Sequence, residues 1–322
     1  IGQIHMLRLP IQLAKSQFVV KALPVLGYLA QFVPPPVNIT RIGLNAVIKV
    51  CRMAGNSLFF RTAFNLHLLG GPKFTNLTLY LQSCMLRSAN KTFTGHNAQH
   101  RQLLALSEEH NRLANFGSPI SAIPPGWDAP AFCSNLSLVD SLVGGALPPP
   151  PGRLRDRPAK GGSLQARYYG RLVELLPDPT DAWIHLLVDR ASMVIKESPC
   201  LLGASFVLTH TELAELIRIL SLCREGSRFM VIKTLVNSWA TSSRMGEAEI
   251  HDCFFCAKSG GDRLPHYLQC DTFWTLLISC AGLGTDQLGI CPLVRGCYSR
   301  PSLTGCNLIT CAFLVYHAIK LQ

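Results

Sequence analysis

Residues 250–274 read IHDCFFCAKSGGDRLPHYLQCDTFW and contain four side chains of the types that bind metals, at the spacing of a metal site. Two residues separate Cys253 from Cys256, and three separate His266 from Cys270. A Cys-x2-Cys pair on a tight turn lets two thiolates approach one ion, and an x3 interval in a helix puts two side chains on one face. Three sulfurs and one imidazole favour tetrahedral Zn²⁺ with every coordination position filled by protein. The spacing therefore predicts a structural zinc site, not a hydrolytic one.

The residues between the two pairs favour a metal site over a chance grouping of cysteines. The chain has 13 cysteines, and cysteine is a common core residue, so some must fall close together by chance. Residues 258–263, KSGGDR, are polar and glycine-rich, which is typical of a bridging turn and not of a core segment. His251 is an alternative ligand in place of one cysteine. The later cysteines match no metal-site spacing and are expected to be ordinary thiols: Cys280, Cys291, Cys297, Cys306 and Cys311.

The overall composition indicates a folded and cationic protein. Apolar residues make up 48% of the 322 residues and charged residues 15%, which excludes a disordered chain and allows two domains. Thirty basic residues against 19 acidic ones give a formal charge of +11. This excess predicts an acidic partner, either nucleic acid or an anionic membrane surface.

Cysteine usage and the lack of leader or membrane segments bear on location. An odd cysteine count, no apparent signal peptide and a zinc site favour a reducing compartment, nuclear or cytoplasmic, over secretion. The apolar stretches 22–33 and 275–294 are broken by proline or glycine and fall short of about 20 continuous apolar residues, so no membrane partner is expected. The chain begins with Ile1, and we expect it to be a fragment that lacks its N-terminal part.

Apolar residues recur at helical spacing on both sides of a proline-rich middle. Examples before it are Leu44, Val47, Ile48 and Cys51; Leu77, Leu81, Cys84 and Met85; and Leu103, Leu106 and Leu113. Examples after it are Trp183, Leu187, Ala191 and Ile195; Leu213, Leu216, Ile217 and Leu220, opened by a capping box at Thr209 and Glu212; and Phe229, Ile232, Val236 and Trp239. The apolar residues 16–32 add a helix near the start. No hairpin dipeptide is flanked by alternating strand patterns, and no internal repeat at solenoid periods is found, so the pattern predicts a mainly α fold.

The middle of the chain predicts a linker. Residues 117–165 are rich in proline, glycine and arginine, and six basic side chains within 153–171 are opposed only by Asp156. Such a stretch is either a solvated spacer or an arm that contacts phosphates. The predicted organisation is a helical region at 1–116, the linker at 117–165, a second helical region at 166–249, the zinc-binding segment at 250–274 and a cysteine-rich tail at 275–322.

Common catalytic motifs are absent. The chain has no phosphate-binding G-x-x-x-x-G-K-S/T loop, no H-E-x-x-H, no G-x-S-x-G and no two adjacent aspartates. Two-metal catalysis needs convergent carboxylates, and none can be assembled here. We therefore expect no catalytic residue and no small-molecule substrate.

Several stretches resemble non-LTR retrotransposon polyproteins. The Cys253, Cys256, His266 and Cys270 pattern with Trp274 is similar to the zinc-binding segment after their reverse-transcriptase domain, and residues 233–245 resemble the helix and turn before it. Residues 22–31, ALPVLGYLAQ, and 69–74, LGGPKF, resemble the region just past the polymerase palm, where the thumb begins. The catalytic palm with its aspartate pair has no counterpart. The resemblance implies a thumb-like helical bundle and a zinc-binding segment without polymerase activity.

The resemblance and the charge together imply a protein that binds RNA or DNA through its phosphates. The candidate contacts are Lys21, Arg41, Lys49, Arg52, Arg61, Arg153, Arg155, Arg157, Arg244, Lys258 and Arg263. Trp239, Tyr267 and Trp274 are either stacking platforms for bases or core residues, and for Trp239 the core is favoured.

Three other functions stay open at this point. A zinc-dependent protein-interaction module would share the metal site but not the salt-sensitive binding of nucleic acid. A membrane-associated helical protein would explain the apolar, basic composition. A decayed remnant of a retroelement would have no selected activity.

Overall fold

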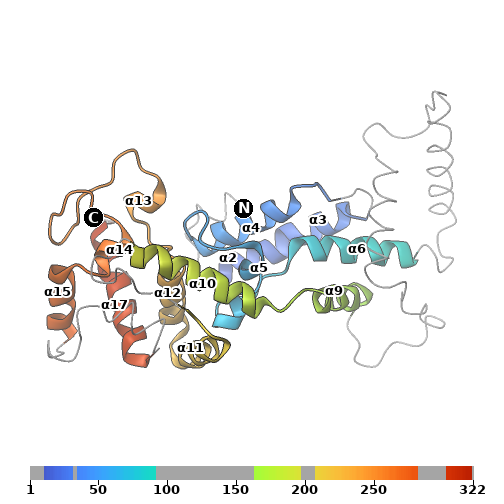
Figure 1. Ribbon diagram of the computed structural model, residues 1–322. Helices are drawn as coiled ribbons and strands as arrows, with labels where there is room; N and C mark the ends of the chain where they lie inside the picture. The colour runs from blue at the N-terminus through green and yellow to red at the C-terminus, as the bar shows by residue number, and fades with distance from the viewer. Residues whose placement is uncertain (1–10, 32–34, 92–162, 197–206, 282–301, 321–322) are drawn as a thin grey trace. The chain divides into compact units, whose positions relative to one another are not determined.

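The computed structural model describes residues 11–31, 35–91, 163–196, 207–281 and 302–320 (Figure 1). Within these ranges every regular element is a helix and none is a strand. The mainly α fold class predicted from the apolar spacing is confirmed. The predicted helix around Leu103 to Leu113 and most of the predicted linker, with Arg153, Arg155 and Arg157, lie outside the described residues.

The described helices occur in the following order along the chain. They are α2 (Ile11–Gln17), the π-helical η1 (Phe18–Ala22), α3 (Leu23–Leu29), α4 (Ile39–Cys51), α5 (Phe60–Ala63), the 3₁₀-helical η2 (Leu66–Leu69), α6 (Leu77–Lys91), α9 (Leu164–Glu174), α10 (Pro179–Lys196), α11 (His210–Leu222), α12 (Glu225–Leu235), α13 (Ser242–Met245), α14 (Leu264–Tyr267), α15 (Asp271–Ala281) and α17 (Leu303–Lys320).

The chain divides into two compact units, each built from segments that are distant in the sequence. Unit 1 comprises Ile1–Lys15, Leu44–Phe74 and Asp178–Gln322, and unit 2 comprises Ser16–Gly43 and Thr75–Pro177. The segment 44–74, which falls in the first predicted region, thus shares a unit with residues 178–322, whereas α9, which also follows the predicted linker, belongs to unit 2. The five consecutive regions stay a prediction.

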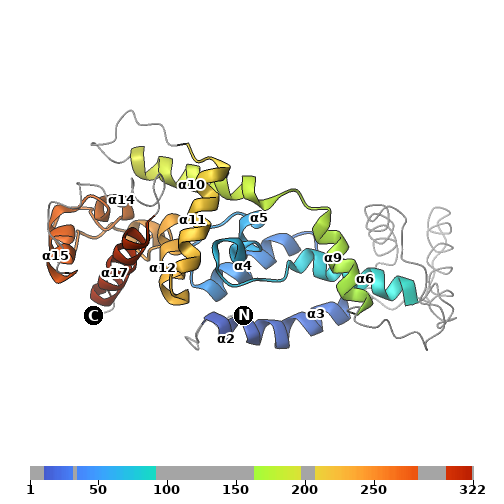
Figure 2. The same cartoon turned by 90° about the horizontal axis from the view of Figure 1, so that it is seen from below.

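In unit 2, α6 and α9 lie side by side (Figures 1 and 2). Their contact buries Leu79 and Leu86 of α6 against Tyr168 and Leu172 of α9. Helix α3 approaches α6 closely at Gly27, where a Cβ atom would lie 2.9 Å from a ring carbon of Tyr80. A side chain at this position would require the Tyr80 ring to move.

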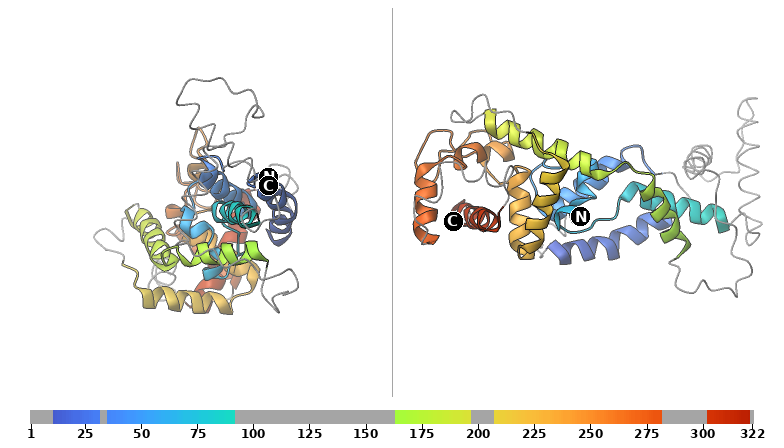
Figure 3. Two further views of the ribbon diagram at one scale, coloured as in Figure 1. Left: turned by 90° about the vertical axis from the view of Figure 1, so that its right-hand side faces the viewer. Right: turned by 60° about the horizontal axis from the view of Figure 1, so that its bottom comes forward.

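In unit 1, a single core joins the helices of the N-terminal segment 44–74 to those after residue 178. The apolar faces predicted from the spacing are buried, among them Val47 and Cys51 of α4 and Leu216 and Leu220 of α11. Helix α10, yellow-green in the right-hand view of Figure 3, crosses α11, and α12 packs along α17 (Figure 2). This arrangement holds the predicted metal segment between helices of the same core.

The ends of the helices confirm one predicted boundary and correct another. The Thr209 hydroxyl accepts from the Glu212 N–H, and the Glu212 carboxylate accepts from the Thr209 N–H, so the predicted capping box opens α11. Helix α12 ends at Leu235 and does not continue to Trp239 as the apolar spacing predicted. Asn237 has a φ of 51°, and the Ser238 N–H donates to Lys233 O at 2.7 Å, which is the geometry of a Schellman stop.

Where a helix was predicted at 16–32, helical structure runs from Ile11 to Leu29 and is interrupted by a π-helical turn. The Leu23 N–H donates to Phe18 O, five residues back, just before Pro24 begins the regular turns of α3. Because proline lacks an N–H and its ring clashes with the carbonyl four residues earlier, the widened turn accommodates it without ending the helix.

Helix α17 is the one described helix that is long and apolar enough to cross a membrane, with a mean hydropathy of 1.2 over Leu303–Lys320. Within unit 1 its residues Ile309, Ala312 and Tyr316 are completely buried in the protein core. A core helix passes the same test of length and composition, so this finding does not by itself indicate a membrane span.

Candidate metal centre

Cys253 and Cys256 lie on a tight turn that brings their sulfurs to one side. The Ala257 N–H donates to Cys253 O and the Cys253 N–H donates to Lys258 O, both at 3.0 Å. Ala257 has a φ of 54°, which reverses the chain immediately after the second cysteine. The turn expected for the Cys-x2-Cys pair is therefore formed by local backbone bonds.

His266 and Cys270 reach the same point from two different elements. His266 lies on the single-turn α14, and Cys270 directly precedes α15, where its carbonyl accepts from the Trp274 N–H at 3.0 Å. The prediction that both project from one helical face is wrong. Residues 268–270 form a turn between the helices, and this turn directs the two side chains toward each other.

The four predicted ligands converge. Their ligand atoms all lie within 4.8 Å of one another, with Cys253 Sγ 3.9 Å from Cys270 Sγ and Cys256 Sγ 3.3 Å from His266 Nε2. A tetrahedral zinc with Zn–S bonds of about 2.3 Å places its sulfurs about 3.8 Å apart. The cluster can thus hold a metal ion such as zinc.

The pKa shifts of Cys256 and His266 favour the forms that bind a metal, whereas that of Cys270 does not. Burial raises the pKa of the Cys256 thiol, but the Lys258 N–H and the neighbouring thiols outweigh it, so that pKa lies below its ordinary value. Burial, together with the charges of Lys258 and Arg263, lowers the pKa of His266, so the imidazole is neutral near pH 7. Burial raises the pKa of Cys270 to about 12, and a divalent cation beside this sulfur would favour its thiolate.

Backbone N–H groups point at the sulfurs. The Phe255 N–H donates to Cys253 Sγ at 3.5 Å, and those of Lys258 and Phe273 donate to Cys256 and Cys270. Such bonds stabilise negative charge on sulfur, because a backbone N–H is a fixed dipole. The protein therefore supplies the electrostatic surroundings that metal-bound thiolates need.

Asp262, between the two ligand pairs, links the segment to the rest of unit 1. Its carboxylate is completely buried and accepts from the Ser242 N–H at 2.7 Å, from the Tyr267 hydroxyl at 3.0 Å and from the Tyr316 hydroxyl at 2.9 Å, and it pairs with Lys320 at 3.2 Å. Burial by itself raises the pKa of this carboxyl, but the Ser242 and Tyr316 bonds and the Lys320 charge outweigh burial and lower it. Asp262 therefore stays ionised and connects α13, α14 and α17.

The sequence pattern did not single out Asp262, because its partners are distant in the chain. Tyr316 and Lys320 lie 54 and 58 residues further on, and Ser242 lies 20 residues earlier. An acidic residue in a polar, glycine-rich loop is ordinarily solvated, so no local signal marked it as buried.

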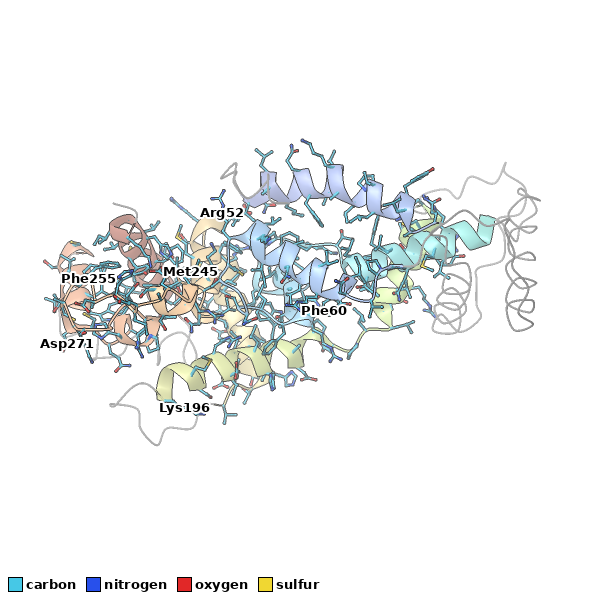
Figure 4. All side chains as sticks on the ribbon, turned by 90° about the horizontal axis from the view of Figure 1, so that it is seen from above. Arg52, Phe60, Lys196, Met245, Phe255 and Asp271 are labelled. Carbon is cyan, nitrogen blue, oxygen red and sulfur yellow. The ribbon has the colours of Figure 1, made fainter. Side chains whose placement is uncertain are left out.

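The three aromatic residues considered as stacking platforms are core residues. Trp239 and Tyr267 are fully buried and Trp274 is 6% exposed. The Trp239 indole N–H donates to Thr234 Oγ1, and the Trp274 indole N–H donates to Tyr267 O. None of these rings presents a free face to a base, so the stacking interpretation is wrong. Phe255, labelled in Figure 4, adds to the same aromatic core through Phe273, 4.5 Å away between ring centroids.

The alternative ligand His251 is not part of the cluster. Its Nε2 atom lies 2.8 Å from the Glu247 carboxylate, on an exposed part of the segment. Among the described residues, the four predicted ligands form the one group that can hold a metal. Cys280, Cys306 and Cys311 are free thiols outside it, while Cys291 and Cys297 lie outside the described ranges.

The predicted phosphate contacts within the described ranges are mostly at the surface. In unit 2 these are Lys21 and Arg41, both exposed. In unit 1 the exposed ones are Lys49, Arg52, Arg61 and Lys258, whereas Arg244 and Arg263 are half-buried. Lys258 and Arg263 lie close enough to the cluster to lower the pKa of His266.

Comparison of the chain with protein-family models, curated proteins and solved structures gives no match.

Proposed function

We propose that the cluster binds one structural zinc ion and that the chain is a non-catalytic, nucleic-acid-binding protein. The convergence of four ligand atoms within 4.8 Å of one another carries the first part. Because the protein fills all four positions of a tetrahedral site, the ion would have no open position for water or substrate. The expected role is therefore to stabilise the fold.

The residues around the cluster support this assignment by charge. Three thiolates and a neutral imidazole bound to Zn²⁺ carry a net charge of −1. The cations Lys258 and Arg263 lie beside His266 and would offset that charge. A bound zinc ion would link the Cys253–Cys256 turn to His266 on α14 and to Cys270 before α15. Asp262 connects the same segment to α17 through Tyr316 and Lys320.

Nucleic acid is the partner that the charge and the resemblance favour. The chain has a formal charge of +11, and each unit has exposed basic residues, among them Lys21 and Arg41 of unit 2 and Lys49, Arg61 and Lys258 of unit 1. Phosphate contacts by such residues give affinity without reading sequence. With the resemblance to the thumb and zinc-binding regions of non-LTR retrotransposon proteins, this favours RNA or DNA template binding in the nucleus or cytoplasm. A protein-interaction module would share the zinc but lack the salt dependence.

Metal content tests the zinc part. Full-length protein should contain one zinc per chain by elemental analysis, and Cys256→Ser should lose it together with thermal stability. Cys311→Ser removes another exposed thiol, on α17, and is the matched control that should keep the metal. Equal zinc content in the two variants would show that the cluster does not bind it.

Salt dependence tests the nucleic-acid part. The affinity of the zinc-loaded chain for single-stranded RNA and for duplex DNA should fall by more than about tenfold between 50 and 200 mM salt, because counterions are released on binding. Binding that is unchanged by salt, or undetectable at low salt, would eliminate this function and leave the protein-interaction module.

A further inference from the structure

Four basic residues of unit 1 surround the loop after α4, residues 52–57. This basic cluster consists of Arg52 in the loop, Arg190 on α10, Lys233 on α12 and Arg244 on α13. Figure 4 labels Arg52 and Met245, which mark the loop and the end of α13. Residues far apart in the sequence are thus brought to one short loop.

Lys233, Arg190 and Arg244 donate hydrogen bonds to neutral backbone and hydroxyl groups. Lys233 Nζ donates to Arg52 O at 3.0 Å, and Arg190 donates to Asn56 O. Arg244 donates to Asn237 O at 2.9 Å and to Ser57 Oγ at 3.4 Å. These bonds hold the cations in place but do not neutralise them.

Little negative charge balances Arg190, Lys233 and Arg244. Among the described residues, the one carboxylate that forms an ion pair with Arg190, Lys233 or Arg244 is that of Asp189, which is 44% exposed and lies 3.1 Å from Arg190. Arg190 is only 7% exposed, and its Nε atom is buried with no acceptor in the described structure. Burial of three cations with one half-exposed carboxylate beside them is unfavourable, so a further anion at this place would be stabilised.

The pKa values show the same imbalance. Burial and then the neighbouring Arg190 lower the pKa of Arg244. Burial lowers the pKa of Lys233 to about 8, against an opposing effect of Cys51 and with a further decrease from Arg52. An anion near these side chains would reverse both shifts.

The loop itself is open to an approaching ligand. Gly55 and Asn56 are exposed, and a Cβ atom at Gly55 would meet nothing within 4 Å. In the described structure, the backbone N–H groups of these two residues have no acceptor. Exposed N–H groups next to arginines are typical of sites that bind phosphate.

We propose that the basic cluster and the exposed loop residues Gly55 and Asn56 bind a phosphate group of a nucleic-acid strand. Arg52 and Arg244 reach the surface and would contact the phosphate, while Arg190 and Lys233 lie behind them and contribute positive potential. Phe59, 37% exposed and 5.7 Å from the Arg190 guanidinium, presents an aromatic ring next to the site, where a base can stack. The inference rests on the proposed nucleic-acid binding and assigns a contact site to it.

Charge-matched variants of the zinc-loaded full chain test the proposal. Arg244→Gln removes one charge, Arg244→Lys keeps the charge but loses the same guanidinium bonds, and Arg218→Gln removes a charge from an exposed residue that pairs with Glu215 on α11. For a fluorescein-labelled single-stranded RNA, Arg244→Gln should weaken binding roughly tenfold and reduce the salt slope by about 0.7, the effect of one lost contact. Arg244→Lys should keep the slope, and Arg218→Gln should match the wild type.

The outcomes separate this site from the general function. RNA binding with the same salt slope in all four proteins would overturn the site and leave the proposed function intact. If the wild type binds no RNA, inorganic phosphate is the second probe, compared with chloride at equal ionic strength in thermal unfolding. A rise in Tm in the wild type and Arg244→Lys but not in Arg244→Gln would support a site for free phosphate, and no rise in any of them would overturn it.

Discussion

At the scale of single residues, the absence of a side chain at Gly261 allows the metal-binding loop to fold tightly. A Cβ atom at this position would lie 2.7 Å from Lys258 O and 2.9 Å from Cys253 Cβ, and backbone at that distance cannot move away without opening the turn. We expect Gly261→Ala to destabilise the protein by about 2–3 kcal/mol, as overpacking does, and to weaken zinc binding. Urea unfolding with zinc and a competition assay with a chromophoric chelator measure the two effects.

Gly226 is the matched control. It lies in the first turn of α12, and a Cβ atom there would meet nothing within 4 Å. Gly226→Ala should leave zinc affinity unchanged and raise stability by up to about 1 kcal/mol, because alanine favours the helix and restricts the unfolded chain. If the two alanine variants behaved alike, close packing at Gly261 would not be the cause.

His317 makes stability depend on pH. Burial lowers its pKa from 6.5 to about 4, against the opposing effect of the bond between Nδ1 and Phe313 O and with smaller further decreases from Lys233 and Lys320. Between these two pH values the unfolded chain binds a proton that the folded chain does not, so protonation favours unfolding. The contribution of the neutral ring is complete above pH 6.5, is lost as pH falls toward 4, and amounts to about 2 kcal/mol after allowance for solvent screening.

His317→Phe tests this because it keeps a ring against Phe313, 3.9 Å away between centroids, without a titrating group. Acid releases zinc from both the wild type and the variant. The informative quantity is therefore the decrease in unfolding free energy from pH 7.5 to pH 5, measured for each protein and then compared. The wild type should lose more stability than the variant across that interval. An equal decrease in the unfolding free energy of the two proteins would mean that the acid sensitivity comes entirely from the metal site.

The four ligands were predictable because each pair is set by local chain geometry, whereas Asp262 was not. The Cys-x2-Cys turn closes through bonds within residues 253–258. The spacing predicted convergence even though His266 and Cys270 belong to no common helix. Asp262 is buried by Tyr316 and Lys320. A contact between residues more than 50 positions apart produces no periodic pattern in the sequence, so it could not be predicted.

At the scale of elements, Asp262 couples the zinc-binding segment to α17. Asp262→Asn replaces one carboxylate oxygen by an amide that would face hydroxyl, N–H and ammonium donors. We expect a loss of about 3 kcal/mol, because the donors of Tyr316 and Lys320 would remain buried or half-buried without a charged acceptor. Urea unfolding of the zinc-loaded protein measures this loss.

A double-mutant cycle shows whether the coupling passes through Tyr316. Tyr316→Phe should cost about 1–2 kcal/mol, since its hydroxyl bonds both Asp262 and Ala240 O, and the double variant should cost less than the sum of the singles. Asp252→Asn, exposed and in the same segment, should change stability by less than about 0.5 kcal/mol. Strict additivity of Asp262 and Tyr316 would argue against a shared network.

Helix positions were predictable where neighbouring residues form an apolar face or a cap, as Thr209 and Glu212 do at the start of α11. The end of α12 was not, because Val236 and Trp239 continue the apolar spacing past the stop at Asn237. Both residues are fully buried, so the apolar spacing predicted their burial correctly but predicted their secondary structure wrongly. An apolar period reflects which residues face the core, and a loop packed on that core can satisfy it.

At the scale of the whole molecule, the order of segments along the chain does not give the order in space. Unit 1 combines residues before and after the predicted linker, and its core includes Val47 and Phe64 together with Trp183 and Trp239. Composition predicted a linker and helices, but which helices share a core depends on pairings over more than 100 residues. Loss of the metal should therefore affect one unit selectively.

Removal of zinc from the full chain should unfold part of unit 1 and spare unit 2. The cluster, Asp262 and α17 belong to one core, whereas α6 and α9 of unit 2 form a separate one. Because affinity for the metal is also folding energy at such sites, a chelator should abolish hydrogen-exchange protection of residues 253–281 and 303–320. Protection of 77–91 and 164–174 should persist. If all segments lost protection together, the two units would unfold as one, and if none did, the metal would not stabilise unit 1.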